Sequence, residues 1–117
     1  MAAPVTLESF VDGARSAVAR ATSFDAKHLI GNALAQLHNA HAYVVSAPAV
    51  DRAYNEVRVH VHGLKVELSS LPMGAPQNHP PVERARQLAL LSIEHYAAAL
   101  GDAQPNEMAK ALGLDWF

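Results

Sequence analysis

The chain has 117 residues, of which half are hydrophobic and 17% are charged, so the sequence predicts one folded domain rather than a disordered or highly charged chain. The formal charge is -2 and no basic run occurs, which argues against nucleic acid as the primary partner. Cysteine is absent, which excludes disulfides, thiolate metal sites and a cysteine nucleophile.

The first half of the chain predicts two helices. Thr6 can cap a helix over about residues 7–22, and a second helix is expected from residue 23 or 25 to about residue 46, before Pro48. No Asp, Glu, Lys or Arg occurs between His28 and Val50, which is typical of a helix that is buried on more than one side.

Such a helix could lie at the centre of the monomer or in a homodimer interface. A chain of this length has little material with which to surround a central helix, so we favour a homodimer. The expected interface follows one seam of the second helix: Ile30, Leu34, Leu37, His41 and Val44.

Residues 50–71 have two interpretations, and the choice decides the fold class. As a helix, they place most apolar residues on one seam but leave Val59 and Val66 on the opposite face. As a β-hairpin over about residues 55–70, with His62-Gly63 as its turn, they bring six apolar residues onto one face and Arg58 opposite Glu67. The hairpin accounts for more residues, and we favour it.

The rest of the chain completes the expected architecture. Residues 72–81 contain four prolines and predict a connection, followed by helices over about residues 81–100 and 105–112. The sequence thus predicts a single domain over residues 1–117, mainly α (α+β), with about four helices and a two-stranded β-hairpin between the second and third. The alternative is an all-α helical bundle.

Seven histidines are the residues that could form a metal site. His38 and His41 lie three apart on a helix, and His60 and His62 would share one face of a strand, so the four together are the alternative metal ligands. No motif supplies the acidic ligands that would complete such a site, and we favour histidines acting as ordinary polar residues, with no metal and no cofactor.

His41 differs from the others because it continues an apolar seam. A buried imidazole needs hydrogen-bond partners for both nitrogens. His41 is therefore either a proton carrier in a pocket or a histidine hydrogen-bonded to a backbone carbonyl or across a dimer axis, and we favour the second. No phosphate loop, Gly-x-Ser-x-Gly motif or suggestive pair of acids occurs, so no catalytic residue is predicted.

These observations favour a non-catalytic adaptor, regulator or inhibitor that binds another protein, as a homodimer. The alternative is a small His-dependent metal-binding protein or enzyme. We expect a cytoplasmic location without membrane contact, because no signal peptide or apolar stretch of about 20 residues is found. The expected partner-binding residues are those of the outer hairpin face and the C-terminal aromatic pair: Arg58, His60, His62, Lys65, Trp116 and Phe117.

Overall fold

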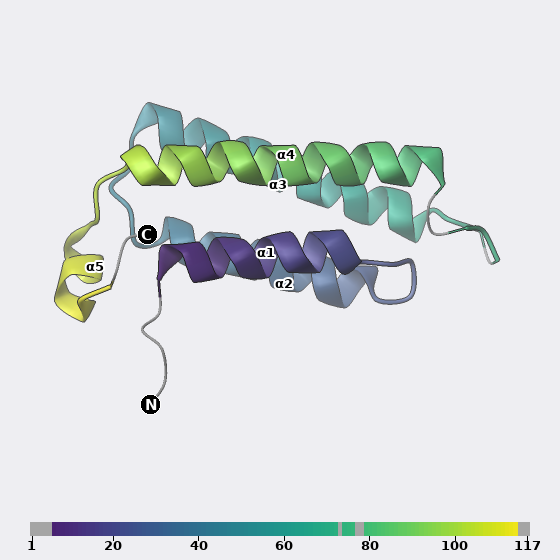
Figure 1. Cartoon of the computed structure of the whole chain (residues 1–117), viewed down its shortest axis with the longest axis horizontal. Coiled ribbons are helices and arrows are strands. Elements are labelled where there is room, and N and C mark those ends of the chain that lie inside the picture. The colour runs from purple at the N-terminus through teal and green to yellow at the C-terminus, as the bar shows by residue number, and fades with distance from the viewer. Residues whose placement is uncertain (1–5, 73, 77–78, 115–117) are drawn as a thin grey trace.

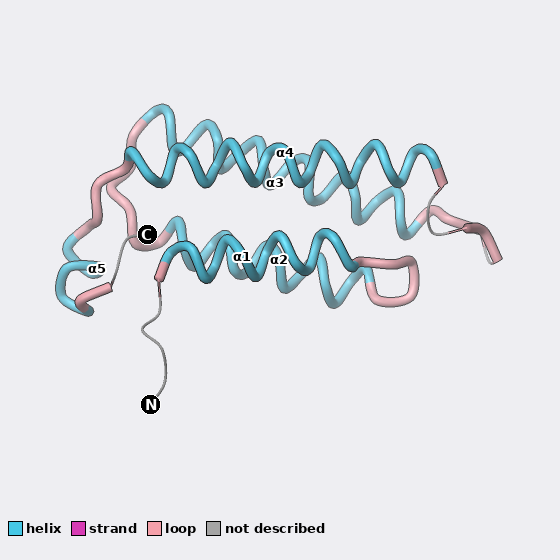
Figure 2. Tube along the Cα trace, viewed as in Figure 1, coloured by secondary structure: helices cyan, strands magenta, loops and turns pink. Residues whose placement is uncertain are grey.

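A computed structural model describes residues 6–72, 74–76 and 79–114. The described residues form four long helices and one short one. Their bounds are α1 Leu7–Arg20, α2 Ala26–His41, α3 Pro48–Ser69, α4 Pro80–Asp102 and α5 Glu107–Leu112. The described part of the chain contains no β-strand, and helices joined by short connections make up the fold (Figure 2).

The four long helices form an antiparallel bundle. Successive helices are joined at alternating ends, and α5 lies beyond one end of the bundle (Figure 1). Each long helix packs against the next, and α1 packs against α4. The Cα atoms extend only 16 Å along the shortest axis, which is the thickness of two packed helices. Every long helix therefore keeps an outer face, and none is surrounded by the others.

One hydrophobic core runs through the bundle. Val11, Leu37, Val61 and Ile93, one from each long helix, have no accessible surface. Alanines fill much of the remaining interior, and small side chains allow helices to approach closely. Among the described residues, no buried side-chain nitrogen or oxygen lacks a hydrogen-bond partner.

Both ends of α1 are capped by side chains. The Thr6 hydroxyl accepts a hydrogen bond from the backbone N–H of Ser9 at 3.1 Å, as the sequence predicts. At the other end Arg86 of α4 donates from Nη1 to the carbonyl oxygen of Val18 at 2.6 Å and from Nη2 to that of Ala21 at 3.0 Å. A guanidinium thus supplies donors to carbonyls that have no partner within the helix.

The predicted hairpin is wrong, because residues 48–69 form one continuous helix that passes through Gly63. The fold is all-α, which is the alternative interpretation. Its buried residues are those of the helical seam: Val50, Val57, Val61, Leu64 and Leu68. Val59 and Val66 are 67% and 49% exposed, as that interpretation requires. Arg58 and Glu67 are therefore not a cross-strand pair, since they lie about two and a half turns apart on the same helix.

Burial of apolar side chains explains why residues 48–69 are more stable as a helix than as a hairpin. Gly63 costs a helix about 1 kcal/mol relative to alanine, whereas each large side chain of the seam gains about 1.5–3 kcal/mol on burial. A 22-residue helix buries that seam in the bundle, where α3 packs against α4 and α2. A two-stranded hairpin of the same residues would be marginally stable without further strands.

The second helix ends earlier than the sequence predicts, at His41 instead of residue 46. Residues 42–45 pair instead with the segment before α5. The N–H of Val45 donates to the carbonyl of Gln104 at 2.8 Å, and the N–H of Asn106 donates to that of Tyr43 at 3.1 Å. These tertiary hydrogen bonds replace the last helical turn, and they also attach α5 to the end of the bundle.

The outer face of α2 is exposed instead of buried, and beyond Lys27 in the first turn it carries no Asp, Glu, Lys or Arg. Ile30 and Leu37 lie in the core, but Gly31, Ala35 and Asn39 are exposed on the opposite side of the helix. Within the described residues, no helix has the length and apolar character that a bilayer span requires.

Candidate functional site

A polar cluster lies where α2 ends and α3 begins. His41 is the last residue of α2, Asp51 lies in the first turn of α3, and Tyr96 projects from α4. Pro48 occupies the first position of α3, where its missing N–H costs nothing. The short connection before Pro48 reverses the chain, and this brings Asp51 back beside His41.

Both ring nitrogens of His41 have partners within the chain. Nε2 lies 3.1 Å from Oδ1 of Asp51, and Nδ1 lies 2.9 Å from the hydroxyl oxygen of Tyr96. A carboxylate only accepts hydrogen bonds, so Nε2 carries the proton and donates to Asp51. Nδ1 then accepts from the Tyr96 hydroxyl. The other oxygen of Asp51 accepts a hydrogen bond from the Ser46 hydroxyl, which completes a network across α2, α3 and α4.

Aromatic rings cover the imidazole. The Tyr54 ring stacks on that of His41 with centroids 4.0 Å apart and an interplanar angle of 5°. Tyr96 lies at 5.8 Å, tilted by 45°. The guanidinium carbon of Arg58 lies 5.6 Å from the centroid of the Tyr54 ring, a cation–π distance. The Tyr54 hydroxyl also lies 3.4 Å from Nδ1 of His38, so this ring connects two histidines and an arginine.

Burial controls the proton affinities of the cluster. Desolvation lowers the pKa of His41, and the nearby charge of His38 lowers it further, while the charge and hydrogen bond of Asp51 oppose the shift. Burial raises the pKa of the Tyr96 hydroxyl, with smaller contributions from Tyr54 and Asp51. At neutral pH His41 is therefore a neutral acceptor and Tyr96 a donor, which agrees with the direction of the hydrogen bond between them.

The burial of Tyr96 limits the chemistry that this cluster could perform. An acid that orients a histidine beside a hydroxyl is also the arrangement that activates a nucleophile. Here, however, the hydroxyl belongs to Tyr96, which is fully buried, and Tyr54 stacks against the imidazole. No substrate atom could reach the Tyr96 oxygen without opening the bundle. His41 thus joins three helices through side chains of its own chain, instead of the backbone carbonyl or the dimer-related partner that we expect from the sequence.

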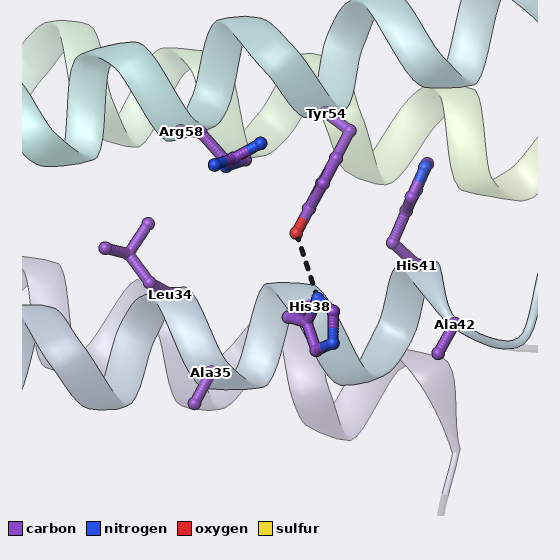
Figure 3. A pocket seen from close by; sticks show the side chains of 7 residues that line it. All are labelled: Leu34, Ala35, His38, His41, Ala42, Tyr54 and Arg58. Atoms are coloured by element: carbon purple, nitrogen blue, oxygen red, sulfur yellow. Dashed lines mark hydrogen bonds between the residues drawn. The ribbon is translucent and has the colours of Figure 1, made fainter.

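A groove lies beside this cluster, between α2 and α3. Its α2 side consists of Leu34, Ala35, His38, His41 and Ala42, and its α3 side of Tyr54, Asn55, Arg58, Val59 and His62. We call it the α2–α3 groove. Figure 3 shows Tyr54 and Arg58 projecting from α3 toward His38 and Leu34 of α2. The part of the groove around His38 and Tyr54 encloses about 620 Å³ and is open to solvent.

The predicted partner-binding residues of α3 do not share one face. Helical spacing places Arg58, His62 and Lys65 on the side toward α2, whereas His60 lies on the opposite side. Arg58 and His62 line the groove, and Lys65 is half-buried. Trp116 and Phe117 lie outside the described residues.

The predicted dimer seam is occupied within the chain. Ile30 and Leu37 have no accessible surface, and Val44 is 7% exposed, so these side chains pack in the monomer core. Leu34 and His41 are half-buried and line the α2–α3 groove. A homodimer of the folded chain would have to use surface other than this seam. The homodimer stays a prediction.

The alternative metal ligands are not gathered into one site. His38 and His41 lie near each other on α2, but His60 and His62 point to different sides of α3. No group of three or more His, Cys, Asp or Glu side chains in the described ranges could hold a metal ion.

Asp51 and Tyr96 are the two residues of the cluster that sequence reasoning missed. Tyr96 is 55 residues from His41 along the chain, and no local pattern connects them. The position of Asp51 could have been predicted from Pro48, which is typical of the first position of a helix. Asp51 is the third residue after Pro48, so it lies in the first turn, close to the end of the preceding helix.

Comparison of the chain with protein-family models, with curated proteins and with solved structures found no match.

Proposed function

We propose that this protein is a non-catalytic binding module that acts by holding a protein partner on the outer surface of its helical bundle. An adaptor, a regulator and an inhibitor all work in this way. The observation that carries the proposal is the state of His41, whose two nitrogens are bound by Asp51 and Tyr96. The hydroxyl that His41 could activate belongs to Tyr96, which is fully buried and out of reach of a substrate.

Exposed apolar side chains support the same proposal. Val59 and Val66 of α3 and Leu88 and Leu91 of α4 are each about half exposed or more. Scattered apolar residues on a surface need no explanation, but Val59 also borders an open groove with the Tyr54 ring and the Arg58 guanidinium, which forms no salt bridge with any described residue. Aromatic residues and arginine are the side chains that most often anchor protein interfaces.

Affinity capture tests the proposal. The full chain would be immobilised through either terminus, and proteins retained from native lysate would be quantified by mass spectrometry. We expect the same partner in both orientations, in near-stoichiometric amount. His41→Gln should retain that partner as long as circular dichroism shows a folded bundle, because His41 has a structural role. Failure of the wild type to retain any protein would contradict the proposal.

The homodimer is tested separately by light scattering. The sequence favours a dimer, whereas the α2 seam that suggested it is packed inside the monomer. A mass near 25 kDa at micromolar concentration, about twice that of the 12.5 kDa chain, would support self-association. A mass near 12.5 kDa would contradict the homodimer prediction.

A further inference from the structure

We propose that the α2–α3 groove is the docking site for an acidic, amphipathic helix of a protein partner. The proposal rests on the function proposed above and names the class of partner and the surface that receives it.

The charge of the groove determines the chemistry of its occupant. Arg58 is the charged side chain at its rim, and no carboxylate among the described residues lies within salt-bridge distance of it. Lys65 continues the basic side of α3 about two turns after Arg58, by helical spacing. The α2 side contributes no formal charge. An acidic segment would therefore meet a cation between the two helices, while Glu56 lies at the outer edge of α3 beside Asn55 and Val59.

The remaining lining favours a helix with an apolar stripe. Leu34 and Val59 supply aliphatic surface on the two sides, and Tyr54 supplies an aromatic surface between them. The uncharged α2 side lets apolar groups approach without desolvating an ion. Two helices side by side form a channel into which the ridge of a third helix fits, as in other complexes where an amphipathic helix enters a groove.

The length of the groove sets the spacing of the anchors. Its α3 side runs from Tyr54 to His62, a rise of about 12 Å. That length matches apolar residues at positions i, i+4 and i+7 of the partner, which span about 10 Å. A glutamate on the flank of that stripe would lie beside Arg58.

Two peptides probe the groove directly. Both are fluorescein-labelled 16-residue helices with leucine at i, i+4 and i+7; one carries glutamate on the flanks of this stripe and the other carries lysine there. Binding to the full chain is measured by fluorescence anisotropy, and the contact surface by ¹⁵N chemical-shift changes. We expect the glutamate peptide to bind, with shifts at Leu34, His38 and Tyr54, and the lysine peptide to bind at least about tenfold more weakly.

Paired variants separate the groove from the rest of the surface. Arg58→Glu should weaken the glutamate peptide at least about tenfold and strengthen the lysine peptide, whereas Arg84→Glu, the same charge reversal at an exposed site on α4, should change neither. Val59→Asp should also weaken binding, and Leu91→Asp on α4 should not. Both apolar positions are more than half exposed, so these variants should fold.

The proposal would be overturned if the glutamate peptide did not bind, if it bound equally to the wild type and Arg58→Glu, or if the shifts were confined to α4. Equal chemical-shift changes with free citrate would assign the groove to a small anion. Displacement of the peptide by self-association of the chain would assign the groove to a second copy. Either result would overturn the proposal as well. The proposed function as a binding module would still be supported if affinity capture retained the same partner on the wild type and on Arg58→Glu.

Discussion

The hydroxyl of Tyr96 donates a hydrogen bond to Nδ1 of His41 across 2.9 Å, and it does so inside the bundle, where Tyr96 has no contact with solvent. This bond joins α4 to the end of α2. Because water has no access to replace the hydroxyl, the bond is a direct source of stability, and removing it leaves an acceptor on the imidazole without a partner.

Tyr96→Phe should therefore destabilise the chain by about 1–2 kcal/mol, the cost of leaving a buried polar group unsatisfied. Urea unfolding followed by circular dichroism measures the change. Tyr43→Phe is the matched control, since the half-buried Tyr43 stacks on Phe10 and none of the described residues accepts a side-chain hydrogen bond from its hydroxyl. Equal stability of both variants would show that the Tyr96 hydroxyl is not engaged.

His41 should make stability depend on pH. Its pKa in the folded chain is lowered by burial below the ordinary value of about 6.5, so the unfolded chain binds the proton more tightly. The contribution of neutral His41 to the free energy of unfolding is therefore expected to be present in full above about pH 6.5 and to decrease as the pH falls below that value.

His41→Gln keeps a polar side chain but does not titrate, and its melting temperature should fall less on acidification than that of the wild type. Thermal melts at several values between about pH 8 and pH 5 measure the difference. Equal losses in the two proteins would mean that another group causes the acid sensitivity.

Arg86 should contribute to stability more than its position near the surface suggests. Its guanidinium donates to carbonyls at the end of α1, so Arg86→Ala should cost about 2–3 kcal/mol, as expected for hydrogen bonds to a charged group. Arg86→Lys should restore only part of this, because an ammonium lacks the planar fork. The exposed Arg84, changed to Ala in the same unfolding assay, should shift stability by less than about 0.5 kcal/mol. A similar effect at both positions would contradict the capping role.

Gly63→Ala distinguishes the helix from the hairpin in solution. Gly63 lies inside α3, and an added Cβ would meet no atom within 4 Å, so alanine should stabilise the chain by about 0.5–1 kcal/mol. In a two-residue hairpin turn the same position would need a positive φ, and alanine would destabilise it. The sign of the change in urea midpoint decides between them.

The sequence predicted the helices whose signals are local. The Thr6 cap and the prolines before α4 act within a few residues, and the structure has helices in those places. The helix that we expect over about residues 81–100 runs to Asp102, two residues further.

The errors arose where distant contacts decide the outcome. Residues 50–71 satisfy a two-residue period and a helical period, and only packing against α4 selects the helix. The end of α2 depends on hydrogen bonds to residues 104 and 106, which no pattern near His41 reveals. His41 itself was recognised as needing two partners, but their identities follow from the bundle geometry.

The most direct test of this account is the protonation state of each nitrogen of His41. A long-range ¹H–¹⁵N correlation spectrum of the full chain at about pH 7.5 reports both ring nitrogens. The account predicts a proton on Nε2, held by Asp51, and none on Nδ1, with the Nδ1 signal changing in Tyr96→Phe. A proton on Nδ1, or the averaged signals of an imidazole exchanging freely between its two tautomers, would contradict the structural role of His41 and reopen the case for chemistry at this site.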